Sequence, residues 1–281
     1  MMPAAEGPLN WAGLSLARPL VMGIVNVTPD SFSDGGRFLD AAAAIDHGRK
    51  LMDEGADILD VGGESTRPGA VPVDADEQLR RVLPVIEALA RAGAAVSVDT
   101  RSATVMSAAA RAGARIVNDV SALEDDPAAL ATVAAAGVAV VLMHKRGDPA
   151  TMQLDTRYGD VVAEVRNYLA ARVAACIAAG MPRNHIALDP GIGFGKTVDG
   201  NVALLRDLHV LGNLGHAVVV GASRKSFIGH LARATPAQDR LAGSLAAALE
   251  AVHRGAHVVR VHDVAATVQA LAVWSALRKP G

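Results

Sequence analysis

Residues 22–36 read MGIVNVTPDSFSDGG, and the character of the sequence changes in the middle of this stretch. Apart from Asn26, residues 22–27 form an apolar run of the kind that makes a buried strand. Residues 28–36 are polar, end in two glycines and contain a single aromatic residue, Phe32. The stretch therefore predicts a buried strand that runs directly into a polar loop.

Short apolar runs of the same kind recur along the 281-residue chain, each followed by a polar loop and a helical pattern. The eight predicted strands are residues 21–27, 58–61, 95–98, 115–118, 138–143, 186–188, 218–220 and 258–261. Apolar strands that alternate with helices are typical of a parallel sheet covered by helices. Eight such units predict an α/β fold, a single-domain (β/α)8 TIM barrel. A doubly wound open sheet is the alternative, because periodicity alone does not show that a sheet closes.

Helix-capping signals lie between the predicted strands. Asp40 and Asp126 are predicted N-caps, and Asp74 with Glu77 has the spacing of a capping box. The predicted helices are residues 40–55, 74–93, 126–137, 158–180 and 239–255. No linker divides the chain, so residues 19–281 are predicted to form the barrel domain and residues 1–18 an N-terminal extension.

The composition excludes several functional classes. A net charge of −2 argues against a broad binding surface for nucleic acid or anionic membranes. The one cysteine, Cys176, rules out an intramolecular disulfide and lies in an Ala-rich helical stretch, where a buried inert thiol is expected. The N-terminus lacks the pattern of a signal peptide, and the longest apolar run, residues 133–143, is too short to span a bilayer. We expect a soluble cytoplasmic protein.

Polar side chains follow every predicted strand, at the end where barrel enzymes carry their chemistry. In strand order they include Asn26; Thr66 and Arg67; Asp99; Asn118 and Asp119; His144 and Lys145; Asp189 and Lys196; Ser223, Arg224 and Lys225; Arg260 and His262. A lone Asp after a strand is usually the N-cap of the next helix, and this interpretation fits Asp99, Asp119 or Asp263 taken singly. It does not explain why all eight strands deliver hydrogen-bonding groups to the same rim.

This set of side chains suggests a ligand with two unlike ends. Carboxylates and amides suit a planar heterocycle rich in N–H donors, and these are Asp99, Asn118 and Asp189. Basic groups suit an anion, and these are Arg67, Lys225, Arg260 and His262. The segment GASRKS adds a strand, a turn and a helix start, where free backbone N–H groups favour negative charge.

Two glycine-rich segments resemble nucleotide-binding motifs but do not match them. GFGKT at residues 193–197 is not a P-loop, because Pro190 occupies the first glycine position of that motif. GIGFGK is not a dinucleotide fingerprint, because its third glycine position is Lys196. No His/Cys cluster has the spacing of a zinc site.

Eight motifs, in this order, together resemble those of the dihydropteroate synthase family. They are MGIVNVTPDSFSDGG, DVGGESTRPGA, SVDT, NDVSA, LMHKRG, LDPGIGFGKT, GASRKSFIG and RVHDV. The first two are long and specific, and the resemblance runs from about Pro19 to the C-terminus. It implies a homodimeric (β/α)8 barrel of folate biosynthesis that requires Mg²⁺. The implied reaction joins 6-hydroxymethyl-7,8-dihydropterin pyrophosphate to p-aminobenzoate, giving 7,8-dihydropteroate and pyrophosphate.

The resemblance also implies roles for individual residues. The implied pterin site consists of Asp99, Asn118, Met143, Asp189 and Lys225. The implied pyrophosphate site consists of Asn26, Thr66, Arg260 and His262, and Asn26 is also the implied Mg²⁺ ligand. The implied p-aminobenzoate pocket consists of Phe32, Thr66, Arg67, Pro68, Phe194, Ser223 and Lys225. The implied catalytic residues are Asp99, Asp189 and Lys225, with Asp30 and Asp34 on a loop that also carries Phe32 and Ser33 and closes over the site.

The implied chemistry needs no protein nucleophile. Pyrophosphate leaves first, Asp99 and Asp189 stabilise the resulting pterin cation, and p-aminobenzoate binds second, in a pocket built largely from loops. Two alternatives are methyltetrahydrofolate–corrinoid methyltransferase domains, which share the barrel and similar Asp and Asn positions, and a non-catalytic pterin-binding paralogue. The motifs SRK and RVHD count against the first, because such a domain binds no pyrophosphate. None of the expected anion-site or loop residues is missing from the sequence, which counts against the second.

Overall fold

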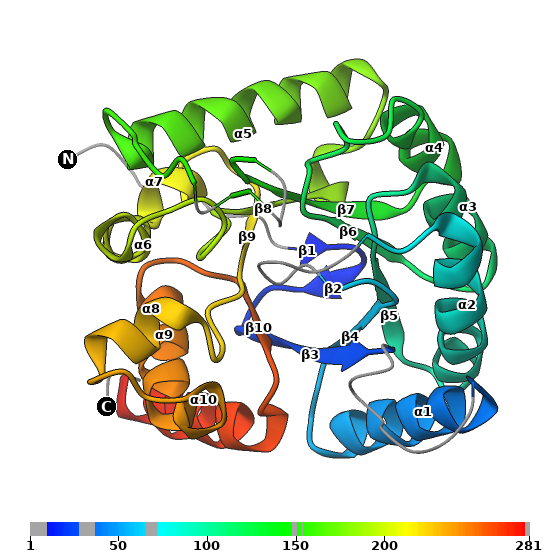
Figure 1. Ribbon diagram of the computed structural model, residues 1–281, viewed down its shortest axis with the longest axis horizontal. Helices are drawn as coiled ribbons and strands as arrows, with labels where there is room; N and C mark the ends of the chain where they lie inside the picture. Colours follow the sequence, from blue (N-terminus) through cyan, green and yellow to red (C-terminus); the bar gives the residue numbers. More distant parts are fainter. Residues whose placement is uncertain (1–9, 28–36, 66–71, 148–150, 153, 279–281) are drawn as a thin grey trace.

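In the computed structural model, which describes residues 10–27, 37–65, 72–147, 151–152 and 154–278, eight parallel strands form a closed barrel (Figure 1). The strands are β3 (Leu20–Asn26), β4 (Ile58–Gly62), β5 (Ala95–Asp99), β6 (Ile116–Asp119), β7 (Ala139–Met143), β8 (Ile186–Asp189), β9 (Ala217–Val220) and β10 (Val258–Val261). Each predicted strand coincides with an observed one to within one residue at either end. β10 pairs with both β3 and β9, so the sheet closes and the open-sheet alternative is wrong.

Helices surround the barrel on all sides in Figure 1. They are α1 (Arg37–Asp53), α2 (Ala75–Arg91), α3 (Ala103–Arg111), α4 (Ala129–Ala136), α5 (Val161–Ala178), α6 (Val198–Arg206), α7 (His209–Gly212), α8 (Ser226–Leu231), α9 (Leu241–His253) and α10 (Val264–Arg278), with short 3-10 turns η2 (Arg183–His185) and η3 (Ala237–Asp239). Over the described part of the chain, no helix is long and apolar enough to cross a membrane.

Two of the helix N-termini depend on aspartate caps. Asp74 accepts a hydrogen bond from the backbone N–H of Glu77 (2.8 Å), which confirms it as the N-cap of α2. The N-cap of α5 is Asp160, whose carboxylate accepts from the backbone N–H groups of Val162 and Ala163. The sequence predicted that α5 begins at residue 158, which is too early.

Two other predicted helix starts are wrong. α1 begins at Arg37, so Asp40 lies inside its first turn, where the helix dipole favours an acidic residue as much as a cap does. α4 begins at Ala129 rather than beside Asp126. The Asp126 carboxylate accepts through Oδ1 from the backbone N–H of Ala128 (2.9 Å) and through Oδ2 from that of Ala103, the first residue of α3 (2.8 Å). Asp126 therefore caps the turn that leads into α4 and also contacts the start of α3.

Cys176 lies buried on α5, as predicted. Burial raises the pKa of its thiol to about 11, so the thiolate is not formed at neutral pH.

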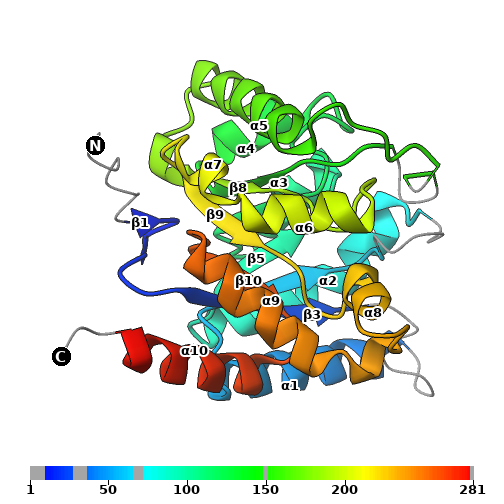
Figure 2. The same cartoon turned by 90° about the vertical axis from the view of Figure 1, so that its left-hand side faces the viewer.

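A short N-terminal hairpin covers one end of the barrel. Strands β1 (Asn10–Trp11) and β2 (Leu14–Ser15) pair antiparallel. Figure 1 shows them across the barrel opening, and Figure 2 shows β1 at one end of the barrel. The Trp11 side chain is fully buried in a cluster with residues that begin the barrel strands. The hairpin lies within the predicted extension 1–18, whose boundary at residue 19 stays a prediction.

The strand register brings the predicted site residues to one level of the barrel. Asn26 at the end of β3 is the register partner of Gly62, which in turn is the partner of Asp99. Asp99 is the partner of Asn118 on β6, and Met143 on β7 is the partner of Asp189 on β8. Asn26, Asp99, Asn118 and Asp189 therefore lie at or next to the ends of their strands, on the rim opposite the hairpin.

We predict that Trp11→Ala destabilises the protein by about 3–5 kcal/mol, because it removes a fully buried aromatic side chain from the closed end of the barrel. The measurement is urea-induced unfolding. Ser15→Ala, an exposed change in the same hairpin, is the control and is expected to alter stability by less than about 0.5 kcal/mol. Equal stability of the two variants would contradict a packing role for Trp11.

Candidate active site

A half-buried arginine lies between two carboxylates inside the barrel. Arg260 on β10 donates from Nε to Asp60 Oδ2 (2.6 Å) and from Nη2 to Asp99 Oδ2 (2.9 Å). The Asp60 side chain is fully buried and that of Asp99 nearly so. Asn118 Nδ2 donates to the same oxygen of Asp60 (3.0 Å). Side chains from β4, β5, β6 and β10 thus form one hydrogen-bonded group.

Sequence reasoning missed Asp60. It lies in the middle of β4, inside the run ILDVG, and not at the end of the strand. A charged residue within an otherwise apolar strand was the available signal, because a buried charge needs a partner. That partner, Arg260, lies 200 residues away in the sequence.

The Asp99 carboxylate has an unusual proton affinity. Burial raises its pKa, Arg260 opposes that rise, and the negative charges of Asp60, Asp119 and Glu64 add to it, giving a value of about 7. Asp99 does not cap the next helix, since α3 begins at Ala103 with Ser102 as its N-cap. The capping interpretation is therefore wrong for Asp99.

Asp119 has a structural role. Its carboxylate is buried and accepts from the backbone N–H and the hydroxyl of Ser121 (both 2.7 Å) and from the backbone N–H of Leu123 (3.0 Å). It stabilises the turn after β6 and does not cap the next helix, α4, whose N-cap is Ala128, so the capping interpretation is wrong for Asp119 as well.

Asp189 on β8 and Lys225, after β9, form a second charged pair that interacts with Arg260. Burial raises the pKa of Asp189, while Lys225 and the backbone N–H of Gly191, which donates to Oδ1 (2.7 Å), oppose that rise. Burial lowers the pKa of Lys225 to about 8, against the attraction of Asp189. Because Arg260 also influences both pKa values, these groups belong to one electrostatic cluster with it.

Lys225 also contacts the loop after β8. Its ammonium group donates to the backbone carbonyl of Ile192 and lies 4.7 Å from the centre of the Phe194 ring. The structure thus brings together Phe194 and Lys225, two residues expected in one pocket.

The loop that carries Phe194 is anchored by a buried lysine. Lys196 Nζ donates to the carbonyl oxygens of Gly191 and Phe194 (both 2.9 Å) and to Nδ1 of His144 (3.0 Å). Burial and the charge of Lys196 lower the pKa of His144 to about 3, which keeps its imidazole neutral and able to accept. Since Lys196 is occupied with its own loop, the rejection of a P-loop agrees with the structure.

The segment after β9 is fixed by a second set of contacts. Ser223 Oγ lies 3.0 Å from Nδ1 of His262, which joins two predicted site residues from β9 and β10. Between Ser223 and Lys225, Arg224 adopts a left-handed conformation (φ 58°) and forms a bidentate ion pair with Asp263 (2.6 and 3.0 Å). Arg224 and Asp263 therefore hold the turn that presents Ser223 and Lys225.

Asn26 and Met143 end their strands at the same rim, with Asn26 half-buried and Met143 buried. The remaining predicted residues lie outside the described residues: Asp30, Phe32, Ser33, Asp34, Thr66, Arg67 and Pro68. Within the ranges that the structure describes, no group of three or more His, Cys, Asp or Glu side chains could hold a metal ion.

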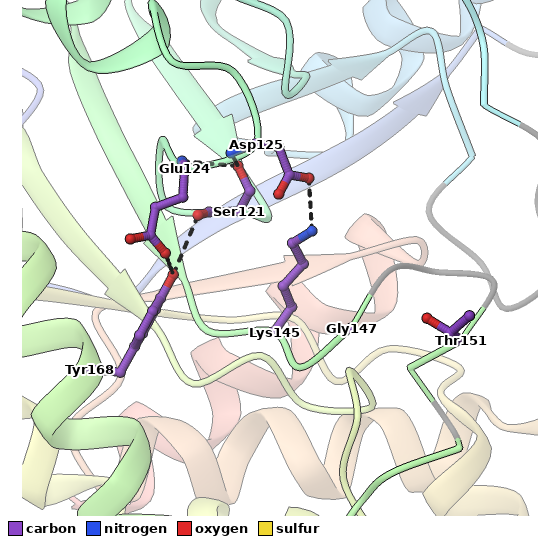
Figure 3. A pocket seen from close by; sticks show the side chains of 7 residues that line it. All are labelled: Ser121, Glu124, Asp125, Lys145, Gly147, Thr151 and Tyr168. Carbon is purple, nitrogen blue, oxygen red and sulfur yellow. Dashed lines mark hydrogen bonds and ion pairs between the residues drawn. The ribbon is translucent and has the colours of Figure 1, made fainter.

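A hollow of about 290 Å³ lies outside this cluster, between the loops that follow β6 and β7. Figure 3 shows Lys145 pointing at Asp125 (2.7 Å) and Tyr168 from α5 pointing at Glu124 (2.7 Å). Lys145 and Arg101 (2.9 Å) neutralise Asp125, and Arg172 neutralises Glu124 (3.0 Å). The hollow therefore lacks the excess of one charge that would attract an ionic ligand.

Known proteins resemble this chain over nearly its whole length. Residues 22–262 match the family described as pterin binding enzyme. A dihydropteroate synthase of Neisseria meningitidis serogroup C is 49% identical over 267 residues, which cover 94% of each chain.

Two solved structures are also close. The Xanthomonas albilineans dihydropteroate synthase with 4-aminobenzoic acid has a TM-score of 0.92 and 52% identity, covering 98% of this chain and 100% of that one. The same enzyme in complex with 7,8-dihydropteroate has a TM-score of 0.87 and 49% identity, covering 95% and 97%. Together with the strand-end cluster of carboxylates and cations, these matches show that the chain belongs to the pterin-binding enzyme family and, within it, to the dihydropteroate synthases.

Proposed function

We propose that the strand-end cluster condenses 6-hydroxymethyl-7,8-dihydropterin pyrophosphate with p-aminobenzoate, giving 7,8-dihydropteroate and pyrophosphate. The observation that carries this proposal is the grouping of buried and half-buried acceptors with half-buried cations at one rim. Asp99, Asn118 and Asp189 supply acceptors, and Arg260 and Lys225 supply positive charge. A ligand with N–H donors at one end and an anion at the other satisfies both sets.

The pterin binds between the acceptors. Its amino and ring N–H groups donate to Asp99, Asn118 and Asp189, and carboxylates accepting such bonds in a buried site gain more than neutral groups do. Met143 packs against the ring, and Lys225 donates a hydrogen bond to it.

The pyrophosphate binds Arg260 and His262, and Thr66, which lies outside the described residues, is a further proposed ligand. Arg260 uses Nε and Nη2 for Asp60 and Asp99, while Nη1 has no hydrogen-bond partner among the described residues. Positive charge at this point stabilises the negative charge that develops as pyrophosphate leaves.

Asn26 fits the part of a Mg²⁺ ligand, because its amide oxygen is a hard donor at the same rim. Mg²⁺ commonly takes only one or two protein oxygens and completes its shell with phosphate oxygens and water, so a single amide ligand such as Asn26 is sufficient. When bound, the ion supplies charge neutralisation for the pyrophosphate.

p-Aminobenzoate binds between Phe194, Ser223 and Lys225 on one side and Phe32, Thr66, Arg67 and Pro68 on the other. The contact of Lys225 with Phe194 supports the first group, and the second group lies outside the described residues. We expect p-aminobenzoate to bind second, after pterin and pyrophosphate have filled the adjoining sites.

The reaction proceeds through a pterin cation. The C–O bond between the pterin CH₂ group and pyrophosphate breaks, and both electrons leave with the oxygen. Asp99 and Asp189 stabilise the positive charge of the ring. The amine of p-aminobenzoate then attacks the CH₂ group with its lone pair, the C–N bond forms, and the nitrogen releases a proton. Asp30 and Asp34, which lie outside the described residues, are proposed to contribute to this step.

Pyrophosphate release on mixing the two substrates tests the function directly. Stoichiometric pyrophosphate and 7,8-dihydropteroate are expected. Methyl transfer that depends on a corrinoid would instead favour the methyltransferase alternative, and pterin binding without turnover would favour a non-catalytic paralogue. A cytoplasmic location stays a prediction of the sequence.

The chain forms a homodimer through the outer surface of α10. Val273 and Leu277, one helical turn apart on this helix, are 57% and 82% exposed. Exposed apolar side chains on the same helix face are typical of an interface. Trp274 lies beside them, with the Arg278 guanidinium 4.6 Å from its ring centre.

We predict that Asp189→Ala weakens pterin binding by about 2–5 kcal/mol, because it removes a buried acceptor from the ligand donors. Isothermal calorimetry gives the affinity. Asp189→Asn keeps an oxygen that can accept from Gly191 N–H, so it controls for loss of the loop contact. Near-normal pterin affinity in both variants would remove Asp189 from the site.

We predict a bell-shaped pH profile of kcat/KM. The profile rises through about pH 7 as Asp99, whose pKa burial raises, loses its proton and becomes an acceptor. It falls through about pH 8 as Lys225, whose pKa burial lowers, loses its charge. In Lys225→Arg the alkaline fall is expected to disappear, because a guanidinium stays protonated in this range. An unchanged alkaline limb in that variant would contradict the role of Lys225.

We predict that Leu277→Asp converts the protein to a folded monomer, because a charge is costly in an apolar interface. Sedimentation equilibrium measures the mass. Leu154→Asp, which changes an equally exposed Leu before α5, is the control and is expected to leave the dimer intact. A wild-type protein that sediments as a monomer at all concentrations would rule out this interface.

A further inference from the structure

We propose that Asp60 is a positioning residue that orients Arg260 and Asn118 with one carboxylate oxygen, and so fixes the anion end and the pterin end of the site relative to each other. The proposal rests on the function proposed above. It assigns a role to a side chain that lies two residues before the end of β4, deeper in the barrel than the residues expected to touch the substrates.

The contacts of Asp60 reach across the barrel interior. Its Oδ2 atom accepts from Arg260 Nε (2.6 Å) and from Asn118 Nδ2 (3.0 Å). Arg260 lies on β10, which is separated from β4 by β3, and Asn118 lies on β6, which is separated from β4 by β5. One oxygen therefore joins side chains from strands that do not pair with β4.

These two contacts fix orientations as well as positions. Because Asn118 uses its NH₂ group to donate to Asp60, its amide oxygen is left to accept from a pterin N–H. Arg260 is held at Nε by Asp60 and at Nη2 by Asp99, so the plane of the guanidinium is set and its remaining edge meets the anion. Rotation of either side chain would exchange donors for acceptors or turn the cation away.

Stability does not account for a carboxylate at this position. A buried ion pair is often no more stabilising than a well-packed apolar residue, because both charges lose their hydration. The other oxygen of Asp60, Oδ1, is fully buried and has no hydrogen-bond partner in the part of the chain that the structure describes. An unpaired buried acceptor costs free energy, so the position favours function over stability.

Two variants separate orientation from charge. Asp60→Asn keeps an oxygen that accepts from both donors and removes only the negative charge. Asp60→Leu fills the space and removes the acceptor. Ser97→Ala is the matched control, because Ser97 is the register partner of Asp60 on β5, is fully buried, and has no hydrogen-bond partner for its hydroxyl among the described residues.

The measurements are kcat and KM for the pterin pyrophosphate, the pH profile and thermal unfolding. For Asp60→Leu we expect a lower melting temperature, because Arg260 Nε and the Asn118 amide both lose their acceptor. We also expect a loss of kcat/KM of about 100-fold, the size of effect that a misplacement of about 1 Å produces. For Asp60→Asn we expect kcat within about 10-fold of the wild type. Its acid limb should move to lower pH, because Asp60 adds to the effect of burial in raising the pKa of Asp99. Ser97→Ala should match the wild type.

The acid limb reports Asp99, which is faced by Arg260 from β10, Asp60 from β4, Asp119 from β6 and Glu64 from the loop after β4. Folded Asp60→Leu with wild-type kcat/KM would overturn the proposal. If Asp60→Leu does not fold, Asp60→Ala takes its place, because it also removes the acceptor of Arg260 and Asn118, and a folded Asp60→Ala with wild-type kcat/KM would overturn the proposal. A wild-type protein that releases no pyrophosphate refutes the proposed function itself, which keeps the two failures distinct.

Discussion

The contact of the Arg260 guanidinium with two buried carboxylates is the interaction on which the rest of the site depends. Asp60 and Asp99 are buried inside the barrel, and without a cation between them one would have to take up a proton or leave the interior. Arg260 reaches both because β10 pairs with β3 and thereby closes the barrel. The same arginine influences the proton affinities of Asp189 and Lys225 on the other side. The charge balance of the site therefore depends on closure of the barrel, which places Arg260 beside the two carboxylates.

The two ends of the barrel divide the work of stability and function. At the end where the strands begin, Trp11 and the apolar residues around it form a closed core. At the end where the strands finish, buried acceptors and cations replace apolar side chains. Lys196 and the Arg224–Asp263 pair support this second end from outside, since they hold the loop that carries Phe194 and the turn that carries Lys225. Removing a supporting contact is thus expected to act through the side chain that it holds.

Much of the fold could be predicted because each strand is a short apolar run in a repeating unit, and the residues at the strand ends followed from the same pattern. Asp60 could not be predicted as a site residue because it lies inside such a run and its partner, Arg260, is 200 residues away in the sequence. Only closure of the barrel brings the two residues together. The hairpin of β1 and β2 escaped because strands of two residues carry no periodicity. The helix start predicted at Asp40 was wrong because aspartate is favoured in the first turn of a helix as well as at its N-cap. The start predicted at Asp126 was wrong because this residue caps the turn before α4 and also contacts the first residue of α3.

A crystal structure of the protein with 6-hydroxymethyl-7,8-dihydropterin pyrophosphate tests the central claim most directly. The account predicts the pterin inside the rim of the barrel, with its N–H edge within hydrogen-bond distance of Asp99, Asn118 and Asp189 and its pyrophosphate at Arg260. A pterin bound elsewhere, such as in the outer hollow beside Asp125 and Tyr168, with the Arg260 cluster unchanged, would contradict it.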